Sequence, residues 1–255
     1  MNKKQAPSKG VEQQLSDSFP LFLSLVWKSL DLPSPTKAQL AIAQYLQNGP
    51  KRLQIQAFRG LGKSWIAAAF VLWTLWNDRD KKILVISASK QRADDFTIFC
   101  QKCILEFDWL AHLRPMDDDQ RWSRVSFDVA GCRPAQAPSV KSVGITGQIT
   151  GSRADLIVFD DVEVPANSAT DLMREKLLQL VTEGESVLTP KADSRIVFLG
   201  TPQTTFTIYR TLRERNYRPF VWPARYPKIL TGYEDVLAPQ LVWDIETKGH
   251  DAVTW

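Results

Sequence analysis

Short apolar runs along this chain alternate with longer stretches in which apolar residues recur at helical spacing. The runs predict strands at residues 53–56, 83–87, 125–129, 156–160 and 195–199, with an edge strand at 219–222. The helical stretches predict helices over residues 19–30, 36–48, 64–77, 90–107 and 172–184. Strands that alternate with helices favour an α/β fold, in which a mainly parallel sheet is flanked by helices on both faces.

The two ends of the chain lack this pattern. Residues 1–18 begin with a polar stretch without the apolar core of a signal peptide, and we expect a flexible N-terminal arm there. Residues 228–255 follow the last predicted strand and are expected to form a small C-terminal lid or linker. The most hydrophobic stretch, residues 65–76, is shorter than the roughly 20 residues needed to cross a bilayer, so we expect no membrane partner. Core and lid contacts are expected from its tryptophans Trp65, Trp73 and Trp76.

Composition narrows the class of protein only slightly. A length of 255 residues suits one large domain, and 44% hydrophobic content supports a packed core. The net charge of +4 and the pI near 8.9 fit a DNA-contacting surface and many other enzymes. Cys100 and Cys103 have no second cysteine pair to complete a zinc site. We therefore interpret them as one apolar face of the helix predicted at 90–107, in a reducing compartment.

A glycine-rich loop directly follows the first predicted strand. Residues 57–64 read Ala-Phe-Arg-Gly-Leu-Gly-Lys-Ser. Gly60 and Gly62 allow the backbone N–H groups to point at phosphate oxygens, Lys63 can reach the β- and γ-phosphates, and Ser64 can ligate Mg²⁺. The usual first glycine of such a loop is Ala57 here. The pattern predicts that the whole loop binds ATP: Ala57, Phe58, Arg59, Gly60, Leu61, Gly62, Lys63 and Ser64.

An acidic cluster follows the predicted strand at 156–160. The apolar run ends in Asp160-Asp161-Val162-Glu163, about a hundred residues after Lys63. Asp160, at the carboxyl end of the strand, is the candidate Mg²⁺ ligand opposite Ser64. Asp161 is the candidate base that orients and deprotonates the attacking water, with Glu163 in reserve. The alternative is a solvated acidic turn.

Two further segments have the spacing expected around such a site. Residues 35–39 match the adenine-reading segment of helicase-like motors, so Gln39 is a candidate for the adenine edge. The alternative is a plain helix start capped by Pro35 or Thr36. After the strand at 195–199, Thr201 and Gln203 are candidate sensors of the γ-phosphate, or simply part of a strand-ending turn.

Arginines are the remaining candidates. Arg59 lies inside the phosphate loop, where it can act as a transition-state clamp within the chain or contact a neighbour's nucleotide. Arg153 precedes the acidic strand on a glycine-bordered loop and is the first candidate for a finger that enters a neighbour's site. The alternative is a surface arginine that pairs with Asp155 or a nearby acid. The arginines and aromatics of residues 209–228 fit either a DNA backbone contact or a solvated helix followed by a strand and linker.

Taken in register, these motifs resemble the large terminase subunit of short-tailed podophages, also called DNA maturase B. The resemblance extends from about Phe22 to about Pro227 and rests on residues 57–64, 139–148, 150–155, 160–163 and 199–204. It implies a RecA-type (ASCE) P-loop ATPase over residues 19–227 that uses ATP and Mg²⁺. Members of the family also carry a nuclease that cuts the DNA concatemer. Because too few residues follow to build one, we expect residues 228–255 to be a linker towards a nuclease domain missing from this chain.

The expected function is that of an ATP-hydrolysing motor that packages viral double-stranded DNA. The resemblance implies assembly into a ring on the procapsid in the host cell cytoplasm. It also implies the portal protein and the small terminase subunit as partners. One alternative is a helicase-like DNA translocase, which needs a second RecA-like lobe. The other is a nucleotide-gated assembly module with little turnover. Nuclease activity is not expected from this chain.

Overall fold

The computed structural model describes residues 9–117, 120–224 and 235–237. Its centre is a sheet of seven strands in the order β3-β4-β2-β5-β6-β1-β7. All neighbouring strands are parallel except the pair β3–β4. Along the chain the strands are β1 (Arg52–Ala57), β2 (Ile83–Ser87), β3 (Ser126–Phe127), β4 (Val140–Gly144), β5 (Leu156–Asp160), β6 (Arg195–Gly200) and β7 (Arg218–Trp222).

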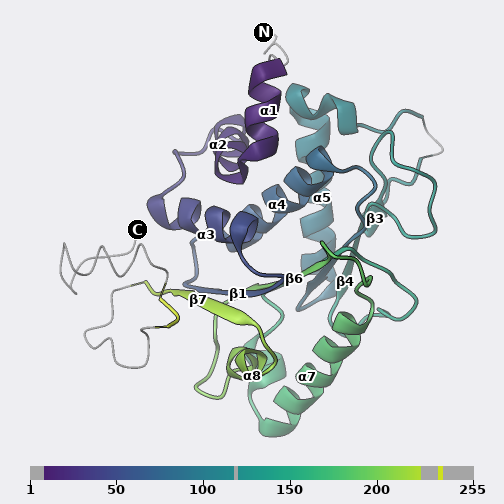
Figure 1. Ribbon diagram of the computed structural model, residues 1–255. Coiled ribbons are helices and arrows are strands. Elements are labelled where there is room, and N and C mark those ends of the chain that lie inside the picture. The colour runs from purple at the N-terminus through teal and green to yellow at the C-terminus, as the bar shows by residue number, and fades with distance from the viewer. Residues whose placement is uncertain (1–8, 118–119, 225–234, 238–255) are drawn as a thin grey trace.

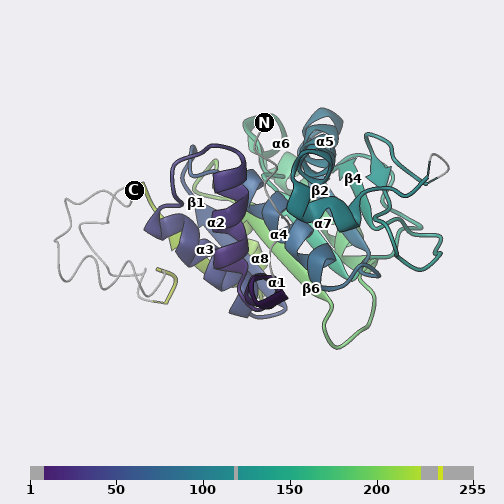
Figure 2. The same ribbon diagram turned by 90° about the horizontal axis from the view of Figure 1, so that it is seen from above.

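Helices cover both faces of the sheet (Figures 1 and 2). The first face carries α1 (Lys9–Asp17), α2 (Phe19–Ser29), α3 (Lys37–Asn48), α4 (Lys63–Asn77), α5 (Lys90–Glu106) and the 3₁₀ helix η1 (Asp108–Leu113). The second face carries α7 (Asp171–Ser186) and α8 (Ile208–Glu214). Successive strand residues enter opposite clusters, as Val158 and Phe159 do. Within the described part of the chain, no helix is long and apolar enough to span a bilayer.

The strand order places several loops at one edge of the sheet. In sequence β1 and β5 are far apart, but only β6 separates them in the sheet. The loops that follow these three strands therefore meet at the carboxyl edge. In open α/β sheets this edge is where ligands bind.

The predicted elements are largely confirmed, with two differences among the strands. β3 is shorter than the strand predicted at 125–129 and runs antiparallel to β4. β4 was not predicted, because Lys141 and Ser142 interrupt its apolar residues. Ser142 is nevertheless buried and accepts a hydrogen bond from Thr97 of α5. The polar pair of Thr97 and Ser142 thus lies inside the core, at a strand position that an apolar residue fills elsewhere in the sheet.

The N-terminal segment also differs from expectation. Residues 9–17 form helix α1 rather than a flexible arm, while residues 1–8 lie outside the described residues. Leu15 is buried, and its carbonyl accepts a hydrogen bond of 2.9 Å from the indole N–H of Trp73. The indole of Trp76 donates to Ser16 in the same way, at 2.9 Å. Partly buried indoles need such acceptors, and these two bonds hold α1 against α4.

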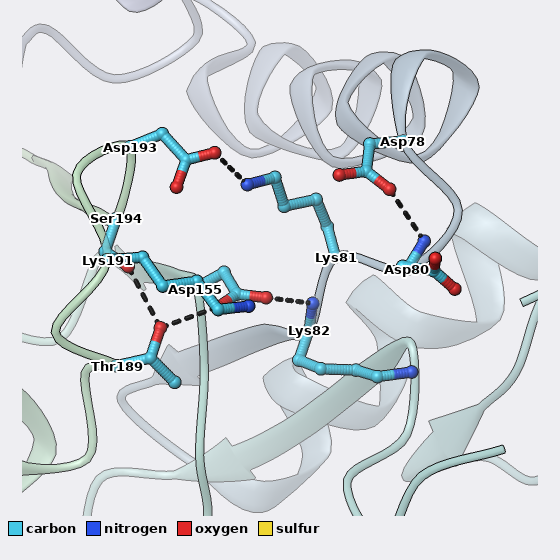
Figure 3. Close-up of polar contacts among 9 residues, drawn as sticks. All are labelled: Asp78, Asp80, Lys81, Lys82, Asp155, Thr189, Lys191, Asp193 and Ser194. Carbon is cyan, nitrogen blue, oxygen red and sulfur yellow. Dashed lines mark hydrogen bonds and ion pairs between the residues drawn. The ribbon is translucent and has the colours of Figure 1, made fainter. Parts of the chain in front are cut away.

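A cluster of polar residues connects the segments at the amino ends of the central strands (Figure 3). Asp155, just before β5, is buried and accepts hydrogen bonds from the Lys82 N–H at 3.1 Å and the Thr189 hydroxyl at 2.6 Å. The ammonium of Lys191 lies 2.8 Å from the same carboxylate. Burial alone would raise the pKa of Asp155, but these donors hold it below its ordinary value. The carboxylate therefore links the starts of β2 and β5 to the loop that leads into β6.

Replacing Asp155 with alanine is expected to lower the free energy of unfolding by about 1–3 kcal/mol, because two partly buried donors lose their buried acceptor. A depressed pKa stabilises the fold above the ordinary aspartate pKa of about 3.9, and this contribution is lost as the pH falls through the lower folded-state value. The difference between wild type and Asp155→Ala should therefore shrink below about pH 3.9 in denaturant titrations. Asp193→Ala is the control: its carboxylate, exposed and paired with Lys81, should contribute less than about 1 kcal/mol. Equal losses for both variants would contradict this assignment.

Candidate nucleotide-binding site

The loop between β1 and α4 has the backbone geometry of a phosphate clamp. Gly60 and Gly62 have φ values of 89° and 80°, in the left-handed region that favours glycine. Helix α4 begins at Lys63, so its N-terminal N–H groups face the loop. A cavity of about 540 Å³ opens beside it. The cavity is lined by Arg59, Gly60, Gly62, Lys63, Ser64, Trp65, Arg92, Asp161, Glu163, Val164, Pro165 and Gln203.

Lys63 is held by neutral oxygens. Its ammonium donates to the carbonyls of Ala57 and Phe58, both at 3.0 Å, and to the hydroxyl of Thr201 at 2.9 Å. Burial lowers the pKa of Lys63, although the charges of Asp161 and Asp160 oppose the shift. Exchanging a neutral acceptor for an anionic phosphate oxygen would strengthen the hydrogen bond. The side chain is therefore preorganised to bind a phosphate.

Ser64 and Asp160 meet at the start of α4. The Ser64 hydroxyl donates to Asp160 Oδ1 at 3.0 Å, although 96 positions separate them in the chain. Burial raises the pKa of Asp160 to about 6, against the opposing effect of the Ser64 hydrogen bond. A buried carboxylate next to a hydroxyl fits Mg²⁺, which binds one or two carboxylates together with substrate phosphates. No group of three or more His, Cys, Asp or Glu residues in the described ranges forms an all-protein metal site, so the nucleotide would have to supply further ligands.

The two carboxylates after Asp160 have different environments. Asp161 lines the cavity with φ 48°, and its Oδ1 accepts a hydrogen bond of 3.1 Å from the Thr201 N–H. Glu163 is 1% exposed and accepts from the Gln203 N–H at 3.0 Å, the Thr207 hydroxyl at 2.7 Å and the Ile208 N–H at 2.8 Å. The alternative of a solvated acidic turn is wrong for the buried Asp160 and Glu163. Since Glu163 is saturated with donors, the geometry favours Asp161 as the group that meets a water molecule.

The loop after β6 is tied to the phosphate loop. Besides meeting Lys63, the Thr201 hydroxyl donates to the Ala57 carbonyl at 2.8 Å. The Gln203 side chain accepts from the Arg59 guanidinium at 2.7 Å and donates to the Thr201 carbonyl at 2.7 Å. Thr201, Gln203 and Arg59 are thus brought together next to the cavity. Their predicted roles as sensors and clamp stay predictions.

Gln39 is engaged in a helix cap. Its side-chain oxygen accepts from the Thr36 N–H at 2.8 Å, and the Thr36 hydroxyl accepts from the Gln39 N–H at 3.3 Å. These two bonds form a capping box, which agrees with the alternative of a helix start capped by Thr36. The Gln39 amide also donates to the Leu61 carbonyl in the phosphate loop at 3.0 Å. Adenine reading by Gln39 therefore stays a prediction. Leu61, whose carbonyl accepts this bond, is itself buried.

Arg153 lies at the opposite edge of the sheet, before the amino end of β5. It is exposed, and its guanidinium donates to the Ser152 carbonyl at 3.3 Å. The carboxylate of Asp155, its predicted alternative partner, accepts from Lys191 instead. Arg153 borders a second cavity of about 230 Å³ together with Lys141. The structure thus keeps Arg153 away from the phosphate loop of its own chain.

Two cavity residues were missed from the sequence. Arg92, in the first turn of α5, faces the phosphate loop and its charge acts on Asp160. The sequence feature that could have identified Arg92 is its position just after the carboxyl end of β2, at the edge where such sheets bind ligands. Trp65 was expected to be a core or lid contact, but it is 42% exposed and lines the cavity. Its ring stacks on Phe99 with a centroid distance of 5.4 Å. Of the predicted core tryptophans, Trp73 and Trp76 do pack against the core cluster.

The basic segment at 209–228 forms helix α8 and strand β7, and its residues 225–228 lie outside the described part. Arg213 pairs with Asp235 at 3.6 Å and Arg215 with Glu185 at 2.9 Å. The helix and the strand agree with the alternative of a solvated helix followed by a strand and linker, and the structure adds the ion pairs of these two arginines. A DNA contact by this segment stays a prediction.

The family model described as "Terminase large subunit, T4likevirus-type, N-terminal" matches residues 55–195, more than half of the chain. The chain belongs to this terminase family. The terminase large subunit of Enterobacteria phage T3 is 51% identical over 236 residues, which cover 91% of this chain and 40% of the relative. The resemblance to large terminase subunits is therefore confirmed. The chain spans less than half the length of this relative.

Solved structures agree on the fold of this chain. The large terminase of bacteriophage HK97 matches 93% of this chain and 49% of its own, with a TM-score of 0.56 and 11% identity. A mutant ATPase domain of the Thermus phage P74-26 large terminase matches 84% of this chain and 81% of its own, with a TM-score of 0.50 and 14% identity. The DEAD-box helicase Mss116 matches 78% of this chain and 41% of its own, with a TM-score of 0.51 and 13% identity. These likenesses confirm the predicted RecA-type α/β class.

Proposed function

We propose that this chain is the ATP-hydrolysing motor of a terminase large subunit and drives viral double-stranded DNA into a procapsid. One observation carries the proposal: Lys63, Ser64 and Asp161 line a single cavity, and the Ser64 hydroxyl also bonds the buried Asp160. This set of groups has the parts that phosphoryl transfer from ATP requires. Membership of the terminase family supports the assignment of DNA as the transported molecule.

Each residue has a role in the proposed reaction. The phosphate loop and the Lys63 ammonium bind the β- and γ-phosphates, while Ser64 and Asp160 hold Mg²⁺. When held by Ser64 and Asp160, Mg²⁺ would supply positive charge that neutralises the negative charge developing on the phosphate oxygens. Asp161 orients the attacking water and accepts its proton. Arg59, from within the loop, stabilises the charge on the transferred phosphoryl group.

The loop after β6 couples the phosphates to the rest of the chain. The Thr201 hydroxyl accepts a hydrogen bond from the Lys63 ammonium, and the Thr201 N–H donates one to the Asp161 carboxylate. A change at the γ-phosphate that moves Lys63 or Asp161 would therefore move Thr201. Gln203, held between Arg59 and Glu163, would follow. This supports the proposed sensor role of Thr201 and Gln203.

The proposal extends to organisation and partners. The ATPase unit would cover residues 19–227, and residues 228–255, mostly outside the described residues, would be a linker. The motor would form a ring on the procapsid in the host cell cytoplasm, with the portal protein and the small terminase subunit as partners. Similarity to the terminase large subunit of phage T3 supports this part of the proposal through family membership.

A helicase-like translocase is the second candidate, favoured by the likeness to the DEAD-box helicase fold. ATP hydrolysis by the purified chain, measured with and without double-stranded DNA and procapsids, separates the candidates. Lys63→Ala provides the background rate. Hydrolysis stimulated by double-stranded DNA and procapsids is expected of a packaging motor. Stimulation by single strands with duplex unwinding would favour a helicase, and rates at background under all conditions would favour a nucleotide-gated assembly module.

A further inference from the structure

The candidate site has a buried tyrosine hydroxyl beside it that has been assigned no role so far. Tyr209, in the first turn of α8, is 1% exposed. Its hydroxyl has no hydrogen-bond partner among the residues that the structure describes. A buried hydroxyl without a partner destabilises a fold, and such groups cluster where they serve a function.

The position of this hydroxyl is defined by Gly200, at the end of β6. A Cβ atom added to Gly200 would lie 1.6 Å from the Tyr209 hydroxyl oxygen and 3.3 Å from Asp161 Oδ1. The hydroxyl and the carboxylate therefore flank the same glycine. Any side chain at position 200 would collide with the Tyr209 hydroxyl and ring.

Two contacts hold Tyr209 in this place. The side chain of Gln54, buried in β1, donates to the Tyr209 carbonyl at 3.1 Å. Glu163 binds the start of α8 through the Thr207 hydroxyl and the Ile208 N–H. Tyr209 is thus fixed from the strand that leads to the phosphate loop and from the segment that carries Asp161.

We propose that Tyr209 is a positioning residue for Asp161: its hydroxyl, without a partner among the described residues in this structure, donates a hydrogen bond to the Asp161 carboxylate once nucleotide is bound and orients this base towards the attacking water. The inference rests on the proposed function, in which Asp161 is the base. No bond forms or breaks at the tyrosine, which keeps its proton throughout.

The environment of Asp161 explains why a second donor is needed. Its backbone has φ 48°, a conformation that costs energy for a residue with a side chain. Within the described contacts, its carboxylate is held by one donor, the Thr201 N–H at Oδ1. One hydrogen bond allows the carboxylate to turn about that contact, whereas two donors on the same side leave Oδ2 in a fixed direction. Burial raises the pKa of Tyr209, and the charges of Asp161, Glu163 and Asp160 add to this shift, so the hydroxyl is a donor at neutral pH.

The test is Tyr209→Phe, which removes one buried oxygen and keeps the ring. We expect kcat for ATP hydrolysis to fall about 10- to 100-fold, because misplacing a reacting group by about 1 Å has effects of this size. KM and the equilibrium affinity for ATP should stay unchanged, since the interaction acts on the base and not on substrate binding. The melting temperature should not fall, because the hydroxyl has no partner to lose.

Tyr217→Phe is the matched control. Tyr217 is also buried in the second core cluster, but its hydroxyl donates to Glu185 at 2.6 Å. This variant should lose stability and keep kcat. A Tyr209→Phe protein with the wild-type kcat would overturn the inference and leave the proposed function standing. A fall in kcat accompanied by an equal loss of ATP affinity would also overturn it. Wild-type protein that hydrolyses no ATP under any assembly condition would overturn the proposed function itself, and the inference with it.

Discussion

Asp161→Asn is expected to slow ATP turnover by roughly two to four orders of magnitude, the usual contribution of a general base and its alignment. Asparagine preserves the size of the side chain and can still accept the Thr201 N–H, a contact of 3.1 Å in the wild type. It cannot accept a proton from water. ATP binding should therefore persist, because the phosphates are held by Lys63 and the loop N–H groups. Equilibrium binding and single-turnover hydrolysis, measured on the same protein, separate the two effects.

Asp160→Asn and Glu163→Gln are the companion variants. Asp160→Asn should weaken binding of ATP in the presence of Mg²⁺, because it removes the charge of the carboxylate next to Ser64. Glu163→Gln should lower stability, since an amide NH₂ group would face N–H and hydroxyl donors that now meet carboxylate oxygens.

One result would overturn the assignment of Asp161 as the base. If Glu163→Gln stops turnover in a folded protein that binds ATP normally, while Asp161→Asn does not, the base is Glu163. The hydrogen bonds of Glu163 would then have to be exchanged for a water during the cycle. The melting temperature of each variant shows whether a lost activity reflects chemistry or unfolding.

The sequence predicted the phosphate side of the site well because its geometry is local. The loop at 57–64 needs left-handed glycines at fixed places before a helix, and a contiguous motif encodes all of these at once. Asp160 could be placed as well, because a run buried on both faces must lie inside the sheet and its last residue must lie at the carboxyl edge. The convergence of Ser64 and Asp160 follows from those two facts.

Other parts depend on how distant segments pack. Glu163 looks like a solvated acid in the sequence, and only the fold of residues 203–208 over it shows that it is a buried acceptor. Arg92 and Trp65 reach the cavity because α5 and α4 pack next to each other, which no local pattern specifies. Strand β4 was missed because its buried positions hold Ser142 and Gly144, whose partners come from α5.

The position of Arg153 supports its predicted role in a neighbouring subunit. It lies at the amino edge of the sheet, whereas the phosphate loop of the same chain lies at the carboxyl edge. It is exposed, and its guanidinium contacts the Ser152 carbonyl of its own loop. An arginine in this place cannot stabilise its own nucleotide, but in a ring that sets one subunit's amino edge against the next subunit's cavity it can reach a foreign one.

Arg153→Ala is therefore expected to lower ATP turnover about a thousandfold in the assembled motor, and the isolated chain should be a poor ATPase with or without the substitution. Arg133→Ala is the control. It removes an exposed arginine that pairs with Asp80, and it should change ATP turnover little. The decisive measurement mixes Lys63→Ala subunits with Arg153→Ala subunits under assembling conditions. Partial recovery is expected, because a Lys63→Ala subunit can offer its intact Arg153 to a neighbour whose phosphate loop is sound. If Arg153→Ala alone matches the wild-type rate in the assembled motor, the assignment is wrong and Arg59, which lines the cavity of its own chain, becomes the arginine to test.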